Sequence, residues 1–423
     1  MSSAAEPLPG TSDLWEPELF DWIALENAAR DVFHRYGYME VRTPIFERTE
    51  VFTHNLGETT DVVQKEMYAF EDRGGRHLTL RPEGTAGVIR AIANRGLEQG
   101  EECRSFYFGP MFRGERPQAG RRRQFHQIGV EAVGSNTPWM DAECVAMLMH
   151  FLEEAGAGGG RLLINTRGLP ADRPLMNKAL SDYFTPHISE MCEDCRRRLE
   201  SNVSRILDCK NPGCQPIIEG APQVAGLMSD ESRRYFDNVC AALEGLGVAF
   251  EVTPRLVRGL DYYVHTVFEV VHPKLDKGAD TLAGGGRYQI CPPGMKGAVE
   301  GIGFACGMER LLLARASNEV KAAGDTNADV MLVCLGEASV PHGLRLAQSL
   351  RHDLPGLRIK ADFTARSMKA QMRTANKVGA SRVLILGENE IAQGVVVCKN
   401  MKDSTQETLS LADVSGALRN IQA

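Results

Sequence analysis

The sequence predicts two folded regions, a large one that mixes strands with helices and a small C-terminal α/β domain. Strand patterns recur through the first region, at 112–131 as a hairpin and then at 262–271, 281–286 and 299–305. Short apolar runs separated by helical segments follow at 330–335, 383–387 and 395–398. That alternation is typical of an α/β domain, and the polar segment 316–327 is expected to be the linker before it.

The other elements of the first region follow from local signals. Helices are expected over 17–36, 83–95 and 138–156, and a second hairpin over 67–80. Thr137 is a suitable N-cap for the third helix, with Pro138 in its first turn. The segment 165–255 is polar and helical, and it separates strand-rich parts of the chain.

Composition and charge exclude some classes of protein. The 423-residue chain has a net charge of −7, but the part from Asp329 onward holds 12 Lys and Arg against 9 Asp and Glu, which permits a local contact with a polyanion. No apolar run approaches the ~18 residues of a membrane-spanning helix. Met1–Gly10 lacks the pattern of a secretory signal, so the eleven cysteines are expected to be reduced thiols in the cytoplasm.

The most informative segment is the hairpin at 112–131. A period of two puts Gln127 and Glu131 on one face of its second strand and Ile128 and Val130 on the other, so the apolar face is expected to pack against the core. Arg113 and an arginine-rich loop are expected to share the space on the polar face. Such a surface suits an anionic polar ligand with a polyanion beyond it, and a solvated surface hairpin is the alternative.

Two further segments carry groups for the same kind of site, although the sequence has no phosphate-binding loop of a common pattern. Glu83 and Thr85 lie where a strand meets a helix, so Glu83 either caps that helix or accepts a ligand ammonium. Arg258 and the paired Tyr262 and Tyr263 interrupt an apolar stretch. The arginine therefore either forms a structural ion pair or binds an anion.

Four cysteines lie within 23 residues of the helical segment, namely Cys192, Cys195, Cys209 and Cys214. Their spacing is compatible with a tetrahedral zinc site, in which the metal would be structural. The second pair is spaced more widely than in the usual zinc knuckle. The alternative is that these cysteines are small buried side chains.

Taken together, these segments resemble one family. Tyr36 to Pro44, Phe112 to Glu131 and Gly301 to Arg310 are similar to motifs 1, 2 and 3 of the class II aminoacyl-tRNA synthetases. Leu256 to Tyr263 and Ala283 to Tyr288 are similar to the signatures of histidyl-tRNA synthetases of bacterial type. The resemblance runs from about Gly10 to the C-terminus, with departures at His265 and in the loop that begins at Gln289.

The resemblance implies a fold and its division. The fold class is an α+β catalytic core built on an antiparallel sheet, over residues 1–320, with a helical insertion at about 167–252. An α/β anticodon-binding domain is expected over 328–423. Members of the family pair through motif 1, so a homodimer is expected, and no membrane partner is.

The reaction implied is the ATP-dependent ligation of L-histidine to the 3′ end of tRNA(His) through a histidyl-adenylate, with ATP and Mg²⁺ required. Arg113 and Arg258 would flank the α-phosphate and Arg310 would bind the γ-phosphate, stabilising charge in the transition state. The residues expected to bind histidine are Glu83, Gly84, Thr85 and Gln127 at the ammonium, and Glu131, Tyr262 and Tyr263 at the imidazole.

The tRNA is expected to contact both regions. Arg116, Gln118 and Arg123 of the motif 2 loop would contact the acceptor end. In the C-terminal domain, a basic stripe on one helix is predicted from Arg366, Lys369, Arg373 and Lys377. Such a stripe is either a solvated face or a contact with tRNA phosphates.

Two other functions fit parts of the sequence. A synthetase-like regulatory subunit of ATP phosphoribosyltransferase has the same core, but typically lacks the anticodon domain and has lost motif arginines, whereas Arg113, Arg258 and Arg310 are present here. A class II synthetase for another amino acid is disfavoured by Glu131 and by the segment from Leu256 to Tyr263.

Overall fold

The computed structural model describes residues 6–56, 60, 62–96, 101–117, 120–258, 262–292, 297–321, 324 and 327–419. The chain divides into two compact units, residues 1–322 and residues 323–423. Each unit has a sheet and a hydrophobic core of its own.

The first unit is rich in strands. These are β1 (Met39–Glu40), β2 (Phe46–Arg48), β3 (Ala69–Glu71), β4 (His77–Leu80), β5 (Cys103–Phe112), β6 (Gln124–Val133), β7 (Arg161–Thr166), β8 (Glu251–Val252), β9 (Tyr263–Val271), β10 (Thr281–Ile290) and β11 (Val299–Gly307). Its core helices are α1 (Glu18–Arg35), α2 (Thr49–Leu56), α3 (Thr85–Arg95), α4 (Pro138–Glu154) and α9 (Met308–Ser317), with a π-helical turn at η1 (Val62–Glu66).

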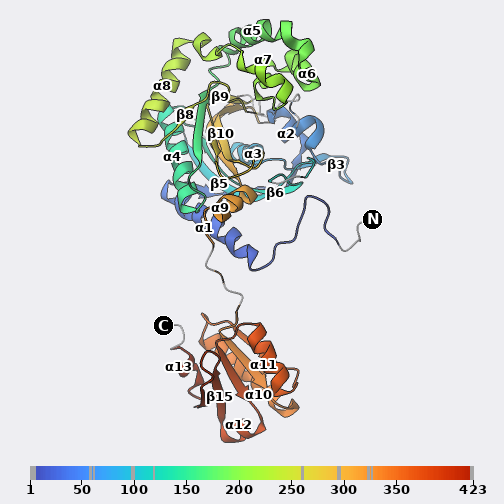
Figure 1. Cartoon of the computed structure of the whole chain (residues 1–423), viewed down its shortest axis with the longest axis vertical. Helices are drawn as coiled ribbons and strands as arrows, with labels where there is room; N and C mark the ends of the chain where they lie inside the picture. Colours follow the sequence, from blue (N-terminus) through green and yellow to red (C-terminus); the bar gives the residue numbers. More distant parts are fainter. Residues whose placement is uncertain are drawn as a thin grey trace. The chain divides into compact units, whose positions relative to one another are not determined.

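The insertion lies between β7 and β8 and is helical, as predicted. It holds α5 (Arg173–Phe184), α6 (Glu193–Ser201), α7 (Gln215–Glu219) and α8 (Asp230–Gly245), with 3-10 segments η2 (Thr185–Glu190), η3 (Val203–Asp208), η4 (Pro212–Cys214) and η5 (Val224–Leu227). Figure 1 shows α5, α6 and α7 gathered at one end of this unit, with α1 and α9 at the other. The insertion has a small apolar core of its own, which includes Phe184, Ile206 and three of the clustered cysteines.

In the described part of the chain, the largest sheet has eight strands in the order β1-β5-β6-β11-β10-β9-β7-β8. The six central strands pair antiparallel, as predicted, and only the short edge strands β1 and β8 pair parallel with their neighbours. The strands β2, β4 and β3 form a separate antiparallel sheet.

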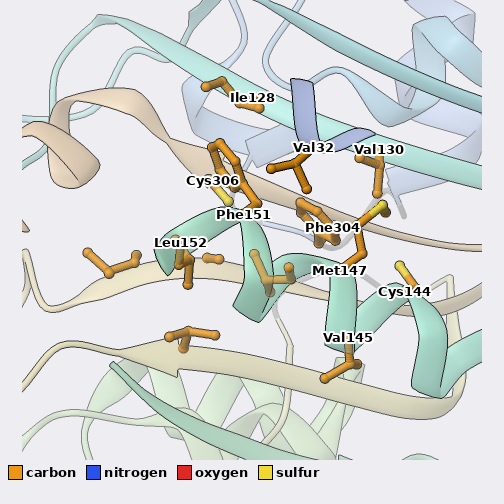
Figure 2. Packing of buried hydrophobic residues seen from close by; sticks show 14 of the residues in the cluster. Val32, Ile128, Val130, Cys144, Val145, Met147, Phe151, Leu152, Phe304 and Cys306 are labelled. Carbon is orange, nitrogen blue, oxygen red and sulfur yellow. The ribbon is translucent and has the colours of Figure 1, made fainter. Parts of the chain in front are cut away.

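One face of the large sheet is covered by α1 and α4. Ile128 and Val130 of β6 are fully buried in this layer, against Val32 of α1 and Phe151 of α4 among others. Figure 2 shows these side chains and Phe304 of β11 in the layer between the helices and the sheet. The predicted apolar face of the hairpin is therefore confirmed, and the alternating residues of β6 are left to the opposite face.

Helix α4 begins as the sequence predicts. Thr137 is extended, and its side-chain oxygen accepts a hydrogen bond from the N–H of Met140 at 3.3 Å, with Pro138 in the first turn. This start places Asp141 one turn into the helix and facing the sheet, where its fully buried carboxylate meets Arg287 of β10 at 2.5 Å.

The second unit is an α/β domain. Its elements are β12 (Val330–Cys334), η6 (Glu337–Ser339), α10 (Val340–Asp353), β13 (Ile359–Asp362), α11 (Met368–Lys377), β14 (Arg382–Leu386), α12 (Glu388–Gln393), β15 (Val395–Asn400), β16 (Gln406–Ser410) and α13 (Val414–Arg419). The sheet order is β13-β12-β14-β15-β16, parallel over the first three strands and antiparallel at β15 and β16. Among the described residues, no helix of either unit is long and apolar enough to cross a membrane.

Candidate active site

A cavity of about 410 Å³ opens on the face of the large sheet opposite α1 and α4. Its wall is built by alternating residues of β6, by the glycine-rich strands β10 and β11, and by side chains from the insertion. Among the predicted site residues, those that line it are Glu83, Thr85, Arg113, Gln127, Glu131, Arg258, Tyr262, Tyr263 and Arg310. Segments that are far apart in sequence are thus brought into one site.

Arg113 follows β5 and is held from two sides. Its Nε donates a hydrogen bond to the carbonyl of Pro82 at 2.9 Å, and its guanidinium lies 5.3 Å from the ring centroid of Phe125. Glu115 is a weaker ionic neighbour at 3.8 Å. These contacts hold Arg113 in the cavity wall, with Glu115 as its ionic neighbour.

Arg258 forms an ion pair with Glu269 of β9 inside the cavity wall. The structural interpretation of this arginine is thus correct, and the ligand interpretation stays open because the same guanidinium lines the cavity. Although burial acts against its charge, Glu269 raises the pKa of Arg258 above its ordinary value. A Cβ at Gly284 of β10 would come within 2.4 Å of this guanidinium, so the strand must carry glycine there.

Arg310 stands in the first turn of α9 and is held by backbone carbonyls. Its guanidinium donates to the carbonyls of Gly120 at 3.1 Å, Thr281 at 2.8 Å and Gly278 at 3.3 Å. Burial, together with the neighbouring charge of Arg121, lowers the pKa of Arg310. A half-buried cation that is fixed by neutral carbonyls is suited to meet an anionic ligand.

The opposite end of the cavity holds buried polar atoms that lack partners. Within the described residues, no hydrogen-bond partner is present for Oε2 of Glu131, Oε1 of Gln127 or the hydroxyl of Tyr288. Burial raises the pKa of Glu131 to about 8, against the opposing effect of the Thr85 and Tyr288 hydroxyls near the carboxyl. Unsatisfied buried acceptors are costly, so this end is suited to a ligand that brings N–H donors.

The depth of Glu131 depends on glycine in the neighbouring strand. Glu131 pairs with Gly303 of β11 across the sheet, and a Cβ at Gly303 would come within 2.3 Å of the Glu131 carboxylate. Any side chain at this position would displace the acid. Gly303 of motif 3 thus leaves room for the Glu131 side chain of motif 2.

Glu83 caps α3, which was one of its two predicted roles. Its two carboxylate oxygens accept hydrogen bonds from the N–H groups of Thr85 at 2.7 Å and Ala86 at 2.8 Å. The carboxyl is also part of the cavity wall, and burial raises its pKa. Gly84 is not among the residues that line the cavity. A Cβ there would come within 2.1 Å of the ring of Tyr107, so this position requires glycine. Its part in the site is to allow this close packing.

The two tyrosines of the signature line the cavity as a pair. The ring centroids of Tyr262 and Tyr263 are 4.7 Å apart, and Tyr262 meets Tyr288 edge-on at 5.9 Å. Arg287 precedes Tyr288 in β10. The guanidinium of Arg287 is fully buried and donates to Asp141 at 2.5 and 2.9 Å and to the carbonyl of Ser135 at 2.9 Å. The signature arginine therefore supports the site from behind.

Three lining residues come from the insertion and were not predicted. Arg205, Asp208 and Lys210 form part of the cavity wall. They flank Cys209 in sequence, and the only sequence signal for them was charge beside a clustered cysteine. Their contribution depends on how the insertion folds back over the sheet, which no local pattern reveals.

Two of the three residues predicted to contact the acceptor end of the tRNA are described, and their environments differ. Arg116 is exposed, as a loop contact requires. Gln118 lies outside the described residues. Arg123 is half-buried, and its backbone N–H donates to the carbonyl of Gly10 at 3.0 Å, so it belongs to the base of the hairpin more than to its tip.

The four clustered cysteines meet in space. The sulfur atoms of Cys192, Cys195, Cys209 and Cys214 all lie within 4.8 Å of one another. The Sγ atoms of Cys192 and Cys209 are 3.7 Å apart, and the N–H of Cys192 donates to Sγ of Cys214 at 3.3 Å. A tetrahedral ion with metal–sulfur bonds of about 2.3 Å would separate its thiolates by about 3.8 Å, so the geometry fits.

The predicted basic stripe is wrong at Arg366. Helix α11 begins at Met368 after the extended Ser367, so Arg366 is outside it. Its guanidinium pairs with Asp362 at 2.5 Å, which holds the chain in the preceding turn. Lys369, Arg373 and Lys377 do share one exposed face of α11 at intervals of four residues.

The antiparallel sheet, the glycine-lined cavity and the fixed arginines at motifs 2 and 3 define a class II aminoacyl-tRNA synthetase. The family model described as histidyl-tRNA synthetase matches residues 10–311, and that described as anticodon binding domain matches residues 329–421. The chain belongs to the histidyl-tRNA synthetase family.

Individual relatives agree over the full length of the chain. A histidine–tRNA ligase of Oleidesulfovibrio alaskensis is 46% identical over 98% of this chain and 99% of its own. Another, from Halothermothrix orenii, is 43% identical over 96% of both chains. The apo structure of S. aureus histidyl-tRNA synthetase has a TM-score of 0.79 and 35% identity, covering 99% of this chain and 100% of that chain.

The alternative family has the same fold at lower similarity. A structure titled as an ATP phosphoribosyltransferase regulatory subunit/histidyl-tRNA synthetase from Bacillus halodurans has a TM-score of 0.63 and 19% identity, covering 92% of this chain and 99% of that chain. This likeness shows the fold alone. The regulatory-subunit alternative is not favoured, since the full-length relatives are ligases.

Proposed function

We propose that this cavity catalyses the reaction of the family, the ATP-dependent ligation of histidine to the 3′ end of tRNA(His) through a histidyl-adenylate. The observation that carries the proposal is the division of the cavity. Arg113, Arg258 and Arg310 are fixed at one end, while Gln127 and Glu131 leave buried acceptors at the other. An anionic co-substrate and a substrate with N–H donors fit this arrangement.

In the first step the carboxylate of histidine attacks the α-phosphorus of ATP. Arg113 and Arg258 flank that phosphate and stabilise the charge that gathers in the transition state, while Arg310 binds the γ-phosphate. These guanidiniums are already held by protein contacts, so little reorganisation is needed. Magnesium would neutralise phosphate charge here, and carboxylates of the wall such as Glu115 would suit its preference for oxygen ligands.

Histidine is recognised at both of its polar ends. Thr85 and Gln127 bind the ammonium together with Glu83, whose carboxylate can accept from it beside the helix N–H groups. Glu131 accepts from the imidazole N–H, with Tyr263 at the ring and Tyr262 beside it. A competitor that lacks the ring N–H leaves the Glu131 carboxyl buried and unmatched, and this mismatch opposes its binding.

The contacts proposed with the tRNA and with a second subunit are based on exposed residues. Arg116 suits a contact with the acceptor end, and Lys369, Arg373 and Lys377 of α11 suit phosphates of the tRNA. Within motif 1 and just after it, Met39, Ile45 and Phe46 are exposed by 54, 44 and 53%, which supports a homodimer through this apolar surface. Sedimentation at micromolar concentration tests the dimer, and a monomer contradicts it.

The four cysteines are proposed to hold a structural zinc ion in the insertion. The close approach of four thiols, three of them buried, supports the assignment. Metal analysis of the purified protein is expected to find about one zinc per chain, and Cys195→Ser is expected to reduce it. A metal-free wild-type protein contradicts the proposal.

The activity itself is tested by ATP–pyrophosphate exchange with each amino acid in turn. Exchange that depends on histidine alone is the expected result. Absence of exchange with histidine, or equal exchange with another amino acid, contradicts the proposed function. Aminoacylation of tRNA(His) with radiolabelled histidine then tests the second step.

A further inference from the structure

The insertion contributes a lysine to the same cavity as the motif arginines. Lys210 lies in the wall together with Arg113 and Arg258, although the three come from segments far apart in sequence. The neighbouring Asp208 joins the two parts of the site. Its carboxyl interacts electrostatically with Lys210 on its own segment, with Arg198 of α6, and with Arg258 and Glu269 of the core. Lys210 therefore lines the cavity and shares the electrostatic neighbour Asp208 with Arg258.

The backbone before Lys210 is fixed by contacts at Cys209. The N–H of Cys209 donates to the carbonyl of Ile206 at 3.0 Å, and the N–H of Asn211 donates to Sγ of Cys209 at 3.5 Å. The side chain of Gln215 donates to the carbonyl of Cys209. Since Sγ of Cys209 also belongs to the four-thiol cluster, an ion bound there would anchor the residue that precedes Lys210.

We propose that Lys210 is a further phosphate-binding residue of this site, and that the four-cysteine cluster positions it through Cys209. The proposal rests on the proposed function and extends it to the insertion. A lysine ammonium is a compact charge with three donors, which suits a phosphate oxygen on the side of the cavity where Arg258 lies. The phosphate belongs to ATP or to the 3′-terminal nucleotides of the tRNA.

The first test is Lys210→Ala, studied by ATP–pyrophosphate exchange and by aminoacylation. The KM for one phosphate-bearing substrate is expected to rise roughly tenfold to a hundredfold, as for loss of a hydrogen bond to a charged group, while the KM for histidine stays the same. A rise for ATP in the exchange assay identifies ATP as the ligand. A rise confined to tRNA in aminoacylation identifies the 3′ end.

Lys178→Ala is the matched control, because Lys178 is an exposed lysine of the same insertion that pairs with Asp182. It is expected to behave as the wild type. Unchanged KM values for both ATP and tRNA in Lys210→Ala, or an equal rise for histidine, overturn the proposal. A wild-type protein without histidine-dependent exchange contradicts the proposed function instead.

The second test concerns the cluster. Cys209→Ser is expected to raise the same KM as Lys210→Ala, and the double variant is expected to show no further rise, because both changes remove one contact. Fully additive effects overturn the link between cluster and lysine. Chelation of the wild-type enzyme, with metal loss measured in parallel, tests the link without a substitution: depletion of the metal with no change in KM also overturns it.

Discussion

The two ends of the cavity differ in how their polar groups are satisfied. At the end proposed to bind phosphates, Arg310 donates to three backbone carbonyls and Arg258 pairs with Glu269. At the end proposed to bind histidine, Glu131 and Gln127 each keep a buried oxygen that has no hydrogen-bond partner in the described part of the chain. The charged groups of the first end thus already have protein partners, although Nε of Arg258 is buried without one, whereas the second end keeps buried acceptor oxygens that have none in the described residues.

Because of this difference, we expect one end to determine mainly the rate of the reaction and the other mainly the choice of substrate. Guanidiniums that are already fixed can stabilise charge as soon as it develops, which mainly lowers the barrier of the chemical step. Buried acceptors without partners are relieved only by a ligand with donors in the right places, which mainly selects the substrate. Substitutions at the two ends are therefore expected to affect different kinetic constants.

The largest effect is expected for Arg258→Ala. Its guanidinium is proposed to stabilise the charge at the α-phosphate, so kcat for ATP–pyrophosphate exchange is expected to fall about 10³-fold, with little change in the KM for histidine. Arg161→Ala is the control, since Arg161 is an exposed arginine paired with Glu251 near the edge of the sheet. A loss of less than tenfold for Arg258→Ala would place the arginine outside the reaction.

The next effect concerns the support behind the histidine end. Asp141→Asn removes the charge partner of the fully buried Arg287 and is expected to lower the free energy of unfolding by about 3 kcal/mol. The value lies at the lower end for a broken buried pair, because the Asn side chain still accepts from Arg287. Denaturant unfolding measures it. Asp182→Asn, at an exposed pair, is expected to change stability by less than about 0.5 kcal/mol, and equal losses would contradict this interpretation.

At the histidine end itself, Glu131→Gln keeps the size of the side chain and removes its charge. The KM for histidine is expected to rise roughly tenfold to a hundredfold, the range for a hydrogen bond to a charged group. The KM for ATP is expected to stay within about twofold, since the arginines are untouched. Parallel losses for both substrates would show that Glu131 has a general structural role.

The smallest effect is a dependence on pH. Burial raises the pKa of Glu131 to about 8, so the free enzyme holds this carboxyl mostly protonated at pH 7. If the imidazole N–H binds the ionised form, histidine affinity increases as pH rises to about 8 and then levels off. The KM for histidine at pH 7 is expected to be about five times that at pH 8. Glu131→Gln is expected to lack this slope, and an identical slope in both proteins would exclude Glu131 as its source.

Local patterns were sufficient for much of the fold. The period of two in the hairpin correctly separated Ile128 and Val130 from the cavity residues, and the cap at Thr137 correctly began α4. The same reasoning failed at Arg366, because the ion pair with Asp362 keeps that residue outside the helix. A spacing rule describes residues within a helix, but it does not say where the helix begins.

The contacts that the site residues make in the folded chain could not be predicted from the sequence. Asp141 and Arg287 are 146 positions apart, and only the packing of α4 on β10 brings them together. The ion pair of Arg258 with Glu269 is likewise a feature of the folded chain, so the sequence alone left a structural role and anion binding as alternatives. Lys210 reaches the cavity because the insertion folds back over the sheet, and this is a long-range feature.

The most direct test of the central claim is the number of protons exchanged when histidine binds. Calorimetric titrations at pH 7.5, in buffers of different ionisation enthalpy, measure this number. Because Glu131 is mostly protonated at that pH and is expected to ionise against the imidazole N–H, the wild type should release more than about half a proton per site. Glu131→Gln should release far less at histidine concentrations that saturate it. Histidine binding to the wild type without proton release would contradict the account of a buried acid that awaits its ligand.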